Sequence, residues 1–112
     1  MNFSIQTISP FERNFKRLLK KYPSLSKDII PVLDYLEKHG QMGTPLGKDC
    51  FKIRMSISSK NSGKSGGARV IAMAKVEQTR VILLYIFDKS EEQSVSDKVL
   101  NELIKVADDM FQ

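Results

Sequence analysis

The chain has 112 residues, 41% of them apolar, which fits a single domain over residues 1–112 with one hydrophobic core. One cysteine and one histidine exclude an internal disulfide and leave too few groups for a zinc site or a pair of catalytic histidines. No apolar run reaches the roughly 18 residues that cross a membrane, and the N-terminus lacks the pattern of a signal peptide, so we expect a cytoplasmic protein.

The net charge of +5 is unevenly distributed along the chain. Residues 48–80 hold eight Lys and Arg against two Asp and Glu, whereas residues 81–112 hold three against seven. A local basic excess indicates an anionic partner more strongly than a uniformly basic surface does. The alternative is a surface charge that serves only solubility.

The first segments predict a short edge strand and then a helix. We expect the strand at residues 2–8. Ser9 is the predicted N-cap of the helix, Pro10 suits its first position, and Glu12 completes a capping box. Pro23 ends this helix, whose basic residues form either a solvated face or an extension of a binding groove.

A second helix is predicted to begin between residues 24 and 28 and to end at Gly40, forming a hairpin with the first. Pro31 is tolerated only in the first turn of a helix, so this helix either starts late or bends there. Residues 41–49 contain glycine and proline without periodicity and are predicted to form a loop.

Three strands and a helix are predicted in the second half. The strands span residues 50–58, 68–76 and 80–87, and the almost continuous apolar run of the last predicts the central strand. A final helix starts at Ser94 or Ser96. The order β-α-α-β-β-β-α predicts an α+β fold, with a curved, mainly antiparallel sheet packed against the helical hairpin and the C-terminal helix.

The first of these strands alternates between apolar and polar residues. Its apolar face carries Phe51, Ile53, Met55 and Ile57, and its other face carries Lys52, Arg54, Ser56 and Ser58. A strand that is buried on one face and cationic on the other presents positive charge to a polyanion. We therefore take RNA binding as the working hypothesis.

The loop at residues 59–67 contains Gly63, Lys64 and Ser65, which invites comparison with the phosphate loop of nucleotide hydrolases. That motif requires a glycine where Ser58 stands and a helix after the loop, where this chain predicts a strand. The loop can still contact phosphates, because glycines let backbone amides approach an anion. The alternative is a simple flexible connection between two strands.

Arg54 and Arg69 are predicted to lie close together, because they occupy strands joined by this loop. Guanidinium groups bind two phosphate oxygens at once and suit the transition state of phosphoryl transfer. Tyr85 is a candidate acid or orienting group, and Lys89 follows the same strand into the expected cleft. The alternatives are an exposed sheet face for the arginines, a core position for Tyr85 and a turn position for Lys89.

From residue 10 to about residue 92 the chain resembles the RelE/ParE superfamily of bacterial toxins, particularly its HigB-like and RelE-like branch. The motifs that carry the resemblance are Pro45-Leu46-Gly47, Phe51-Lys52-Ile53-Arg54, the stretch from Gly63 to Ile71, and the stretch from Val81 to Glu91. The glycine-lysine loop leading into Ala-Arg-Val-Ile, followed by the Leu-Leu-Tyr strand, is the most specific combination.

The resemblance implies a toxin of a type II toxin–antitoxin system that inhibits translation by cleaving messenger RNA, usually in the ribosomal A site. In such enzymes the ribose 2′-hydroxyl attacks the adjacent phosphate, and neither a metal nor another cofactor takes part. A cognate antitoxin protein silences the toxin. The superfamily also contains ParE-like inhibitors of DNA gyrase, so such an inhibitor, or an inactive RNA-binding relative, is the alternative.

By position, the resemblance assigns phosphate binding and charge stabilisation to Arg54 and Arg69, and it makes Lys64 the catalytic candidate in the loop. Tyr85 and Lys89 complete the candidate catalytic group, and the residues expected to hold the RNA are Lys52, Lys60 and Ser65. Several relatives have a catalytic Tyr or His shortly after the last strand, where this chain instead continues into an acidic helix. Tyr85, which comes earlier, is the nearest substitute.

Overall fold

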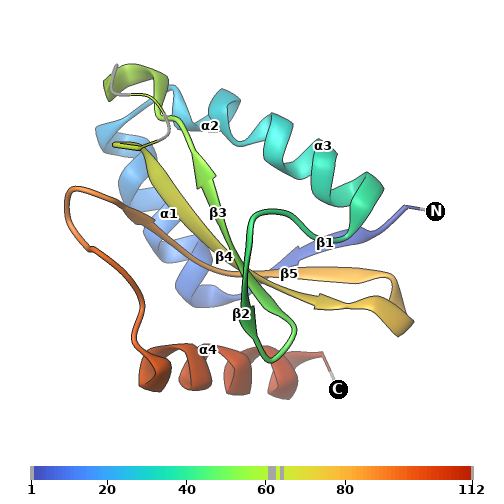
Figure 1. Ribbon diagram of the computed structural model, residues 1–112. Coiled ribbons are helices and arrows are strands. Elements are labelled where there is room, and N and C mark those ends of the chain that lie inside the picture. Colours follow the sequence, from blue (N-terminus) through green and yellow to red (C-terminus); the bar gives the residue numbers. More distant parts are fainter. Residues whose placement is uncertain (1, 61–62, 64, 112) are drawn as a thin grey trace.

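The computed structural model describes residues 2–60, 63 and 65–111. The fold is α+β, as predicted: a twisted five-stranded sheet carries helices α1, α2 and α3 on one face and α4 on the other (Figure 1). The elements are β1 (Ser4–Thr7), α1 (Ser9–Lys21), α2 (Leu25–Asp28), α3 (Ile30–His39), β2 (Thr44–Gly47), β3 (Cys50–Met55), the 3-10 turn η1 (Ser58–Lys60), β4 (Ala68–Lys75), the 3-10 turn η2 (Val76–Gln78), β5 (Arg80–Asp88) and α4 (Asp97–Met110).

The strand order is β1-β5-β4-β3-β2. β1 runs parallel to the first half of β5, and the other pairs are antiparallel. The prediction that β5 is the central strand was wrong, because β4 occupies the centre. The apolar run of β5 resembles that of a central strand because both faces of β5 are covered, so that it is almost as fully buried as β4.

The predicted capping box at the start of α1 was also wrong. The backbone stays extended through Ile8, whose N–H donates to the Leu83 carbonyl and prolongs the β1–β5 ladder. Ile8 is therefore the N-cap residue, and the helix begins at Ser9, one residue too early for Ser9 to cap it. The Glu12 carboxylate accepts instead from the hydroxyl of Thr7.

The second predicted helix is broken, as Pro31 indicated. α2 ends at Asp28 and α3 begins at Ile30, so that Pro31 occupies the first turn of α3, where a missing N–H costs little. Gly40 ends α3 with a φ of 77°, as expected for a left-handed C-terminal cap.

One strand was not predicted. Residues 44–47 form β2, an edge strand exposed along its whole length, within the stretch expected to be a loop. Its Pro45 and Gly47 are typical of loops, so the sequence does not predict a strand here. Both residues are tolerated because an edge strand has one side without a pairing partner. Gly43 lets the chain meet β3 closely, since a Cβ there would lie 2.2 Å from the Lys52 carbonyl oxygen.

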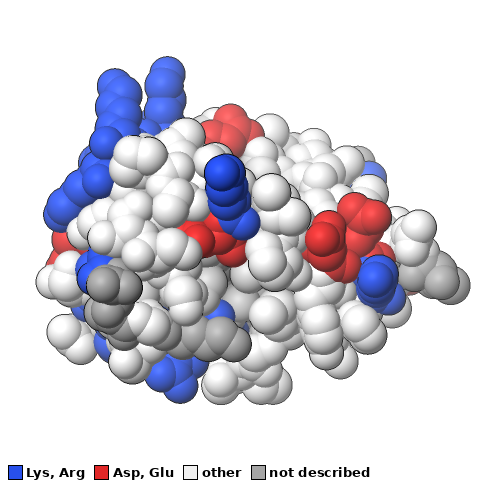
Figure 2. All heavy atoms as spheres, turned by 90° about the horizontal axis from the view of Figure 1, so that it is seen from above, with Lys and Arg blue, Asp and Glu red and all other residues white. Residues whose placement is uncertain are grey.

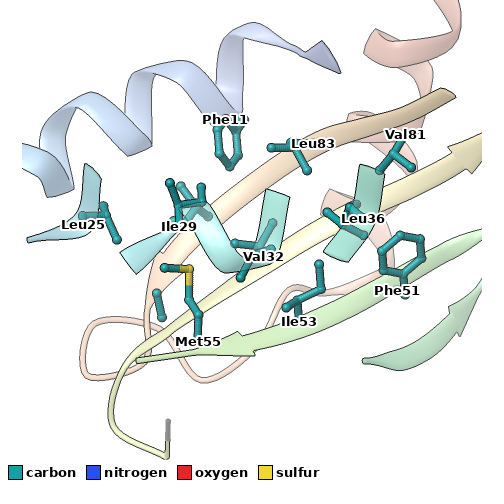
Figure 3. Close-up of a cluster of buried hydrophobic side chains, with 14 of the residues drawn as sticks. Phe11, Leu25, Ile29, Val32, Leu36, Phe51, Ile53, Met55, Val81 and Leu83 are labelled. Atoms are coloured by element: carbon teal, nitrogen blue, oxygen red, sulfur yellow. The ribbon is translucent and has the colours of Figure 1, made fainter. Parts of the chain in front are cut away.

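The sheet separates two hydrophobic cores. The larger one packs α1, α2 and α3 against residues of β3, β4 and β5, and Figure 3 labels some of its side chains, among them Phe11, Val32 and Ile53. The predicted apolar face of β3 lies wholly in this core. Burial of each large aliphatic side chain contributes about 1.5–3 kcal/mol, so this core accounts for much of the stability.

The smaller core lies under α4, which buries Leu100, Leu103 and Ala107 against the opposite face of the sheet. The polar contacts of α4 with Lys75 and Arg80 lie at the end of the sheet where β4 turns into β5. α4 therefore crosses one end of this face and leaves the opposite end to other residues. Within the described residues, no helix is long and apolar enough to cross a membrane.

Candidate nucleic-acid interface

Two rows of side chains cross the end of the sheet away from α4. Residues that pair directly on adjacent antiparallel strands project from the same face. The strand register gives one row of Arg54, Arg69 and Phe87 and a neighbouring row of Lys52, Ile71 and Tyr85. Ile71 and Phe87 belong to the core under α4, so both rows lie on that face. Four of the predicted site residues are thereby brought together.

Arg54 and Arg69 are directly opposite each other on β3 and β4. Arg69 is only 5% exposed, and its guanidinium donates to the carbonyl oxygens of Ala68 (3.1 Å) and Ser65 (3.3 Å). Burial, and then the positive charge of Arg54, lower the pKa of Arg69. Two opposed cations destabilise a strand pair, and an anion bound between them would reverse that effect.

Arg54 is exposed and borders two shallow hollows at the edge of β3. One, of about 380 Å³, is also lined by Lys52 and Thr44, and the other, of about 300 Å³, by Lys27 and Asp28. Within the described part of the chain, the side chains of Arg54 and Lys52 make no hydrogen bond or ion pair. Their donors are therefore available to a ligand that approaches from this edge.

Ser65 and Lys89 lie at the same end of the face. The Ser65 carbonyl accepts from Arg69, and the Lys89 N–H donates to the Gly67 carbonyl (3.0 Å), extending the β4–β5 ladder past the end of β5. The Lys89 ammonium donates to the backbone and side-chain oxygens of Gln93. Only a glycine fits at position 67, because a Cβ there would lie 2.1 Å from the Met55 carbonyl oxygen.

Lys60, expected to hold RNA, is engaged elsewhere. Its ammonium is 2.7 Å from a carboxylate oxygen of Asp88, which is fully buried, and lies over the ring of Tyr22. Asp88 also accepts from the hydroxyls of Tyr22 and Ser90. Burial alone would raise the pKa of Asp88, but these hydrogen bonds hold it well below its ordinary range. Lys64, the predicted catalytic residue of the loop, lies outside the described residues.

A second carboxylate fixes the start of the glycine-containing loop. Asp28 accepts from the Ser58 N–H (2.9 Å) and hydroxyl (2.6 Å) and from the Ser24 hydroxyl (2.8 Å). Burial alone would raise the pKa of Asp28, but these three bonds together hold it below the ordinary value. Asp28 thereby ties η1 to the junction of α1 and α2. Neither Asp28 nor Asp88 was predicted, because their partners are distant in the sequence.

Tyr85 is partly exposed, and its hydroxyl donates to a carboxylate oxygen of Glu92 at 2.7 Å. Burial, and then the bond to Glu92, raise the pKa of Tyr85. Its ring centroid is 6.1 Å from that of Phe87, which is opposite Arg69. Glu92 is a further residue that sequence reasoning missed, since an acid in a connecting segment carries no recognisable pattern.

Other reactive groups lie away from this face or are inert. His39 stacks on Tyr35 at the end of α3, at a centroid distance of 4.1 Å. Cys50 is buried, and burial raises the pKa of its thiol to about 11, so the thiol is not a nucleophile at neutral pH. Among the described residues, no group of three or more His, Cys, Asp or Glu side chains can hold a metal ion.

The opposite side of the molecule carries α1, α2 and α3. Figure 2 shows this side: most of its Lys and Arg side chains gather at the left end, and uncharged residues and a few acids cover much of the rest. In Figure 1 the same end holds η1 and the junction of α1 and α2. The cations of this side therefore gather at the end of the molecule that holds η1.

Comparison with known proteins agrees with this architecture. A family described as the RelE toxin of the RelE/RelB toxin–antitoxin system matches residues 11–112. A free-state structure of an arginine-to-alanine double mutant of the Escherichia coli toxin RelE superposes with a TM-score of 0.61 at 16% identity, covering 94% of this chain and 97% of that one.

The isolated E. coli RelE toxin superposes with a TM-score of 0.55, also at 16% identity, covering 92% of this chain and 96% of that one. No curated protein sequence matches the chain. At this identity the two structures establish the fold alone, whereas the family match spans nearly the whole chain. The chain belongs to the RelE toxin family of toxin–antitoxin systems.

Proposed function

We propose that this protein is a toxin that inhibits translation by cleaving messenger RNA on the ribosome, through attack of a ribose 2′-hydroxyl on the adjacent phosphodiester. The observation that carries the proposal is the direct opposition of Arg54 and Arg69 on β3 and β4, where the Arg54 side chain is exposed to solvent. Two neighbouring guanidinium groups raise the free energy of the empty protein and lower that of a complex with a phosphate, whose charge grows in the transition state.

The proposed roles follow from exposure and position. Arg54, which is exposed, receives the phosphate, and Arg69, held by backbone carbonyls, stabilises the developing charge from below. Lys52 and Lys89 flank the arginines and contact the RNA backbone. Tyr85 is the group on this face able to handle a proton, because guanidinium groups stay charged and do not titrate.

Lys60 and Ser65 receive revised roles. Lys60 neutralises the buried Asp88 and so anchors the start of the loop that precedes β4. The backbone of Ser65 orients Arg69, and its side chain is left to contact RNA. Lys64 stays the loop residue for which the family resemblance implies a catalytic role.

Two partners accompany this function. The family implies a cognate antitoxin, and the basic face is complementary to an acidic segment of such a protein. The second partner is the ribosome, because a protein of this size with a small basic face contacts few nucleotides by itself. Presentation of a single codon in the A site would provide the missing orientation of the message.

The test is to map messenger-RNA ends by primer extension in a translating extract and in the same extract depleted of ribosomes. Wild-type protein should cut within codons only when ribosomes are present, and Arg54→Ala and Arg69→Ala should reduce cutting by at least about 10²-fold. Lys98→Ala, an exposed change on α4, is the matched control. Circular dichroism establishes that each variant is folded.

Two results would contradict the proposal. Intact messages at high concentrations of wild-type protein would exclude the nuclease, and a supercoiling assay with DNA gyrase would then be the next measurement. Normal cutting by both arginine variants would show that the nuclease activity does not depend on Arg54 and Arg69.

A further inference from the structure

Two consecutive glutamates in the segment that follows β5 accept hydrogen bonds, one from α1 and the other from β5. Glu91 receives both terminal nitrogens of Arg17 on α1, at 3.2 and 3.0 Å, and the Lys21 ammonium lies 3.6 Å from it. The next residue, Glu92, accepts from the Tyr85 hydroxyl at 2.7 Å. The contacts of Glu91 hold the segment against α1. The contact of Glu92 places a carboxylate beside Tyr85, which belongs to the candidate RNA face.

We propose that Glu92 is a positioning residue for RNA cleavage that receives the phenolic proton of Tyr85, so that Tyr85 can accept the proton of the ribose 2′-hydroxyl. This inference rests on the proposed function. It places a carboxylate beside the phenol of Tyr85, in a protein whose single histidine lies at the end of α3.

The geometry favours this direction of proton transfer. The only hydrogen of the phenol is directed at Glu92, so the oxygen of Tyr85 presents its lone pairs to a substrate hydroxyl rather than a donor. The charged or polar groups that face the phenol are Glu92, Asn14 and Arg17. Glu92 raises the pKa of Tyr85, which keeps the phenol protonated until substrate arrives, whereas Asn14 and Arg17 lower it.

The step balances without a further reactant. The 2′-hydroxyl gives its proton to the oxygen of Tyr85 while the phenolic proton passes to Glu92. The 2′-oxygen then forms its bond to phosphorus, the bond from phosphorus to the 5′ oxygen breaks, and that oxygen takes a proton from water. The products are a 2′,3′-cyclic phosphate and a 5′-hydroxyl, and Glu92 returns its proton to solvent.

The test compares wild type, Glu92→Gln and Tyr85→Phe, with Glu102→Gln on the exposed side of α4 as the matched carboxamide control. Tyrosinate absorbance is recorded against pH, and subtraction of the Tyr85→Phe curve isolates Tyr85 from Tyr22 and Tyr35. Single-turnover cleavage on ribosomes is then measured from acid to alkaline pH. Glu92 is partly exposed, so the glutamine variant is expected to fold.

In Glu92→Gln, Tyr85 should ionise at a lower pH than in wild type, and the cleavage rate at neutral pH should fall about 10²-fold with little change in KM. The remaining rate should rise with pH as tyrosinate replaces the missing carboxylate, whereas the wild-type rate should be flat around neutrality. Glu92→Asp should restore part of the rate.

Equal rates and equal pH dependence for wild type and Glu92→Gln would overturn the relay and leave the proposed function standing. Unchanged ionisation of Tyr85 in the glutamine variant would also overturn it, because the contact would then be absent in solution. Failure of wild type to cleave any message would overturn the proposed function and the relay together.

Discussion

Arg54 on β3 pairs directly with Arg69 on β4, but the two side chains differ in exposure: Arg69 is 5% exposed, whereas Arg54 is open to solvent. The buried guanidinium is held by two backbone carbonyls, and its pKa is lowered by burial and by its neighbour. The exposed one adds repulsion to the folded state of the free protein. A site that is unfavourable when empty is expected where the ligand brings the compensating charge.

Arg54→Gln should therefore stabilise the free protein while weakening RNA binding. Removal of one of two opposed like charges should raise the free energy of unfolding by about 0.5 kcal/mol. Loss of one phosphate contact should also reduce the slope of log affinity against log salt concentration by about one. Urea denaturation and the anisotropy of a labelled RNA at several salt concentrations measure both effects. Lys98→Gln is the control, and a less stable Arg54→Gln would contradict the electrostatic account.

Asp88 should dominate the acid sensitivity of the fold. Its pKa is lower in the folded protein than in the unfolded chain, so its stabilising contribution is complete above the unfolded value of about 3.9 and is lost as the pH falls below it. Asp88→Asn leaves the ammonium of Lys60, whose side chain is 15% exposed, without its buried partner and should cost about 3 kcal/mol at pH 7.

The measurement for Asp88 is the free energy of unfolding in urea at a series of pH values. Wild type should lose stability steeply below about pH 4, and Asp88→Asn should show a shallower loss over that range. Asp34→Asn, an exposed change on α3, should follow the wild-type curve. Parallel curves for wild type and Asp88→Asn would show that other carboxylates control acid unfolding.

Local patterns predicted the parts of the fold that depend on neighbours in the sequence. The alternation along β3 identified its buried face because a strand has a period of two, and Gly40 marked the end of α3 because a left-handed cap favours glycine. The opposition of Arg54 and Arg69 followed from the hairpin that joins their strands. These inferences needed no information about distant segments.

Contacts between distant segments explain the errors and omissions. β2 is a strand only because it pairs with β3, and Ser9 fails to cap α1 because the preceding residue pairs with β5. Lys60 reads as a cation in a basic loop, and only the fold brings it to Asp88, 28 positions away. Glu92 meets Tyr85 because Arg17 holds the intervening segment against α1.

The two predicted helix starts provide a direct comparison of capping. The Ser96 hydroxyl accepts from the Val99 N–H at 3.2 Å, so Ser96→Ala should lower the free energy of unfolding by about 1 kcal/mol. Ser9 lies inside the first turn of α1 and its side chain makes no cap, so Ser9→Ala should change stability by less than about 0.5 kcal/mol. Thermal and urea unfolding of both variants test the difference, and equal losses would contradict it.

Gly67 should be indispensable to the arginine pair although it carries no side chain. It immediately precedes β4, and a Cβ at this position would lie 2.1 Å from the Met55 carbonyl oxygen, a backbone atom next to Arg54. Because backbone cannot move aside as a flexible side chain does, Gly67→Ala should push β3 and β4 apart where the two arginines face each other. The cost should be about 2–3 kcal/mol of stability.

Gly63→Ala is the control for Gly67→Ala. Gly63 has a φ of 67°, so alanine adds backbone strain of about 1–2 kcal/mol, but no described residue lies within 4 Å of a Cβ added there and the strand pairing should be unaffected. Urea unfolding and single-turnover cleavage below the unfolding transition separate the two positions. Gly67→Ala should lose cleavage more than about tenfold because the guanidinium groups no longer meet one phosphate, and full cleavage by this variant would show that their spacing is not critical.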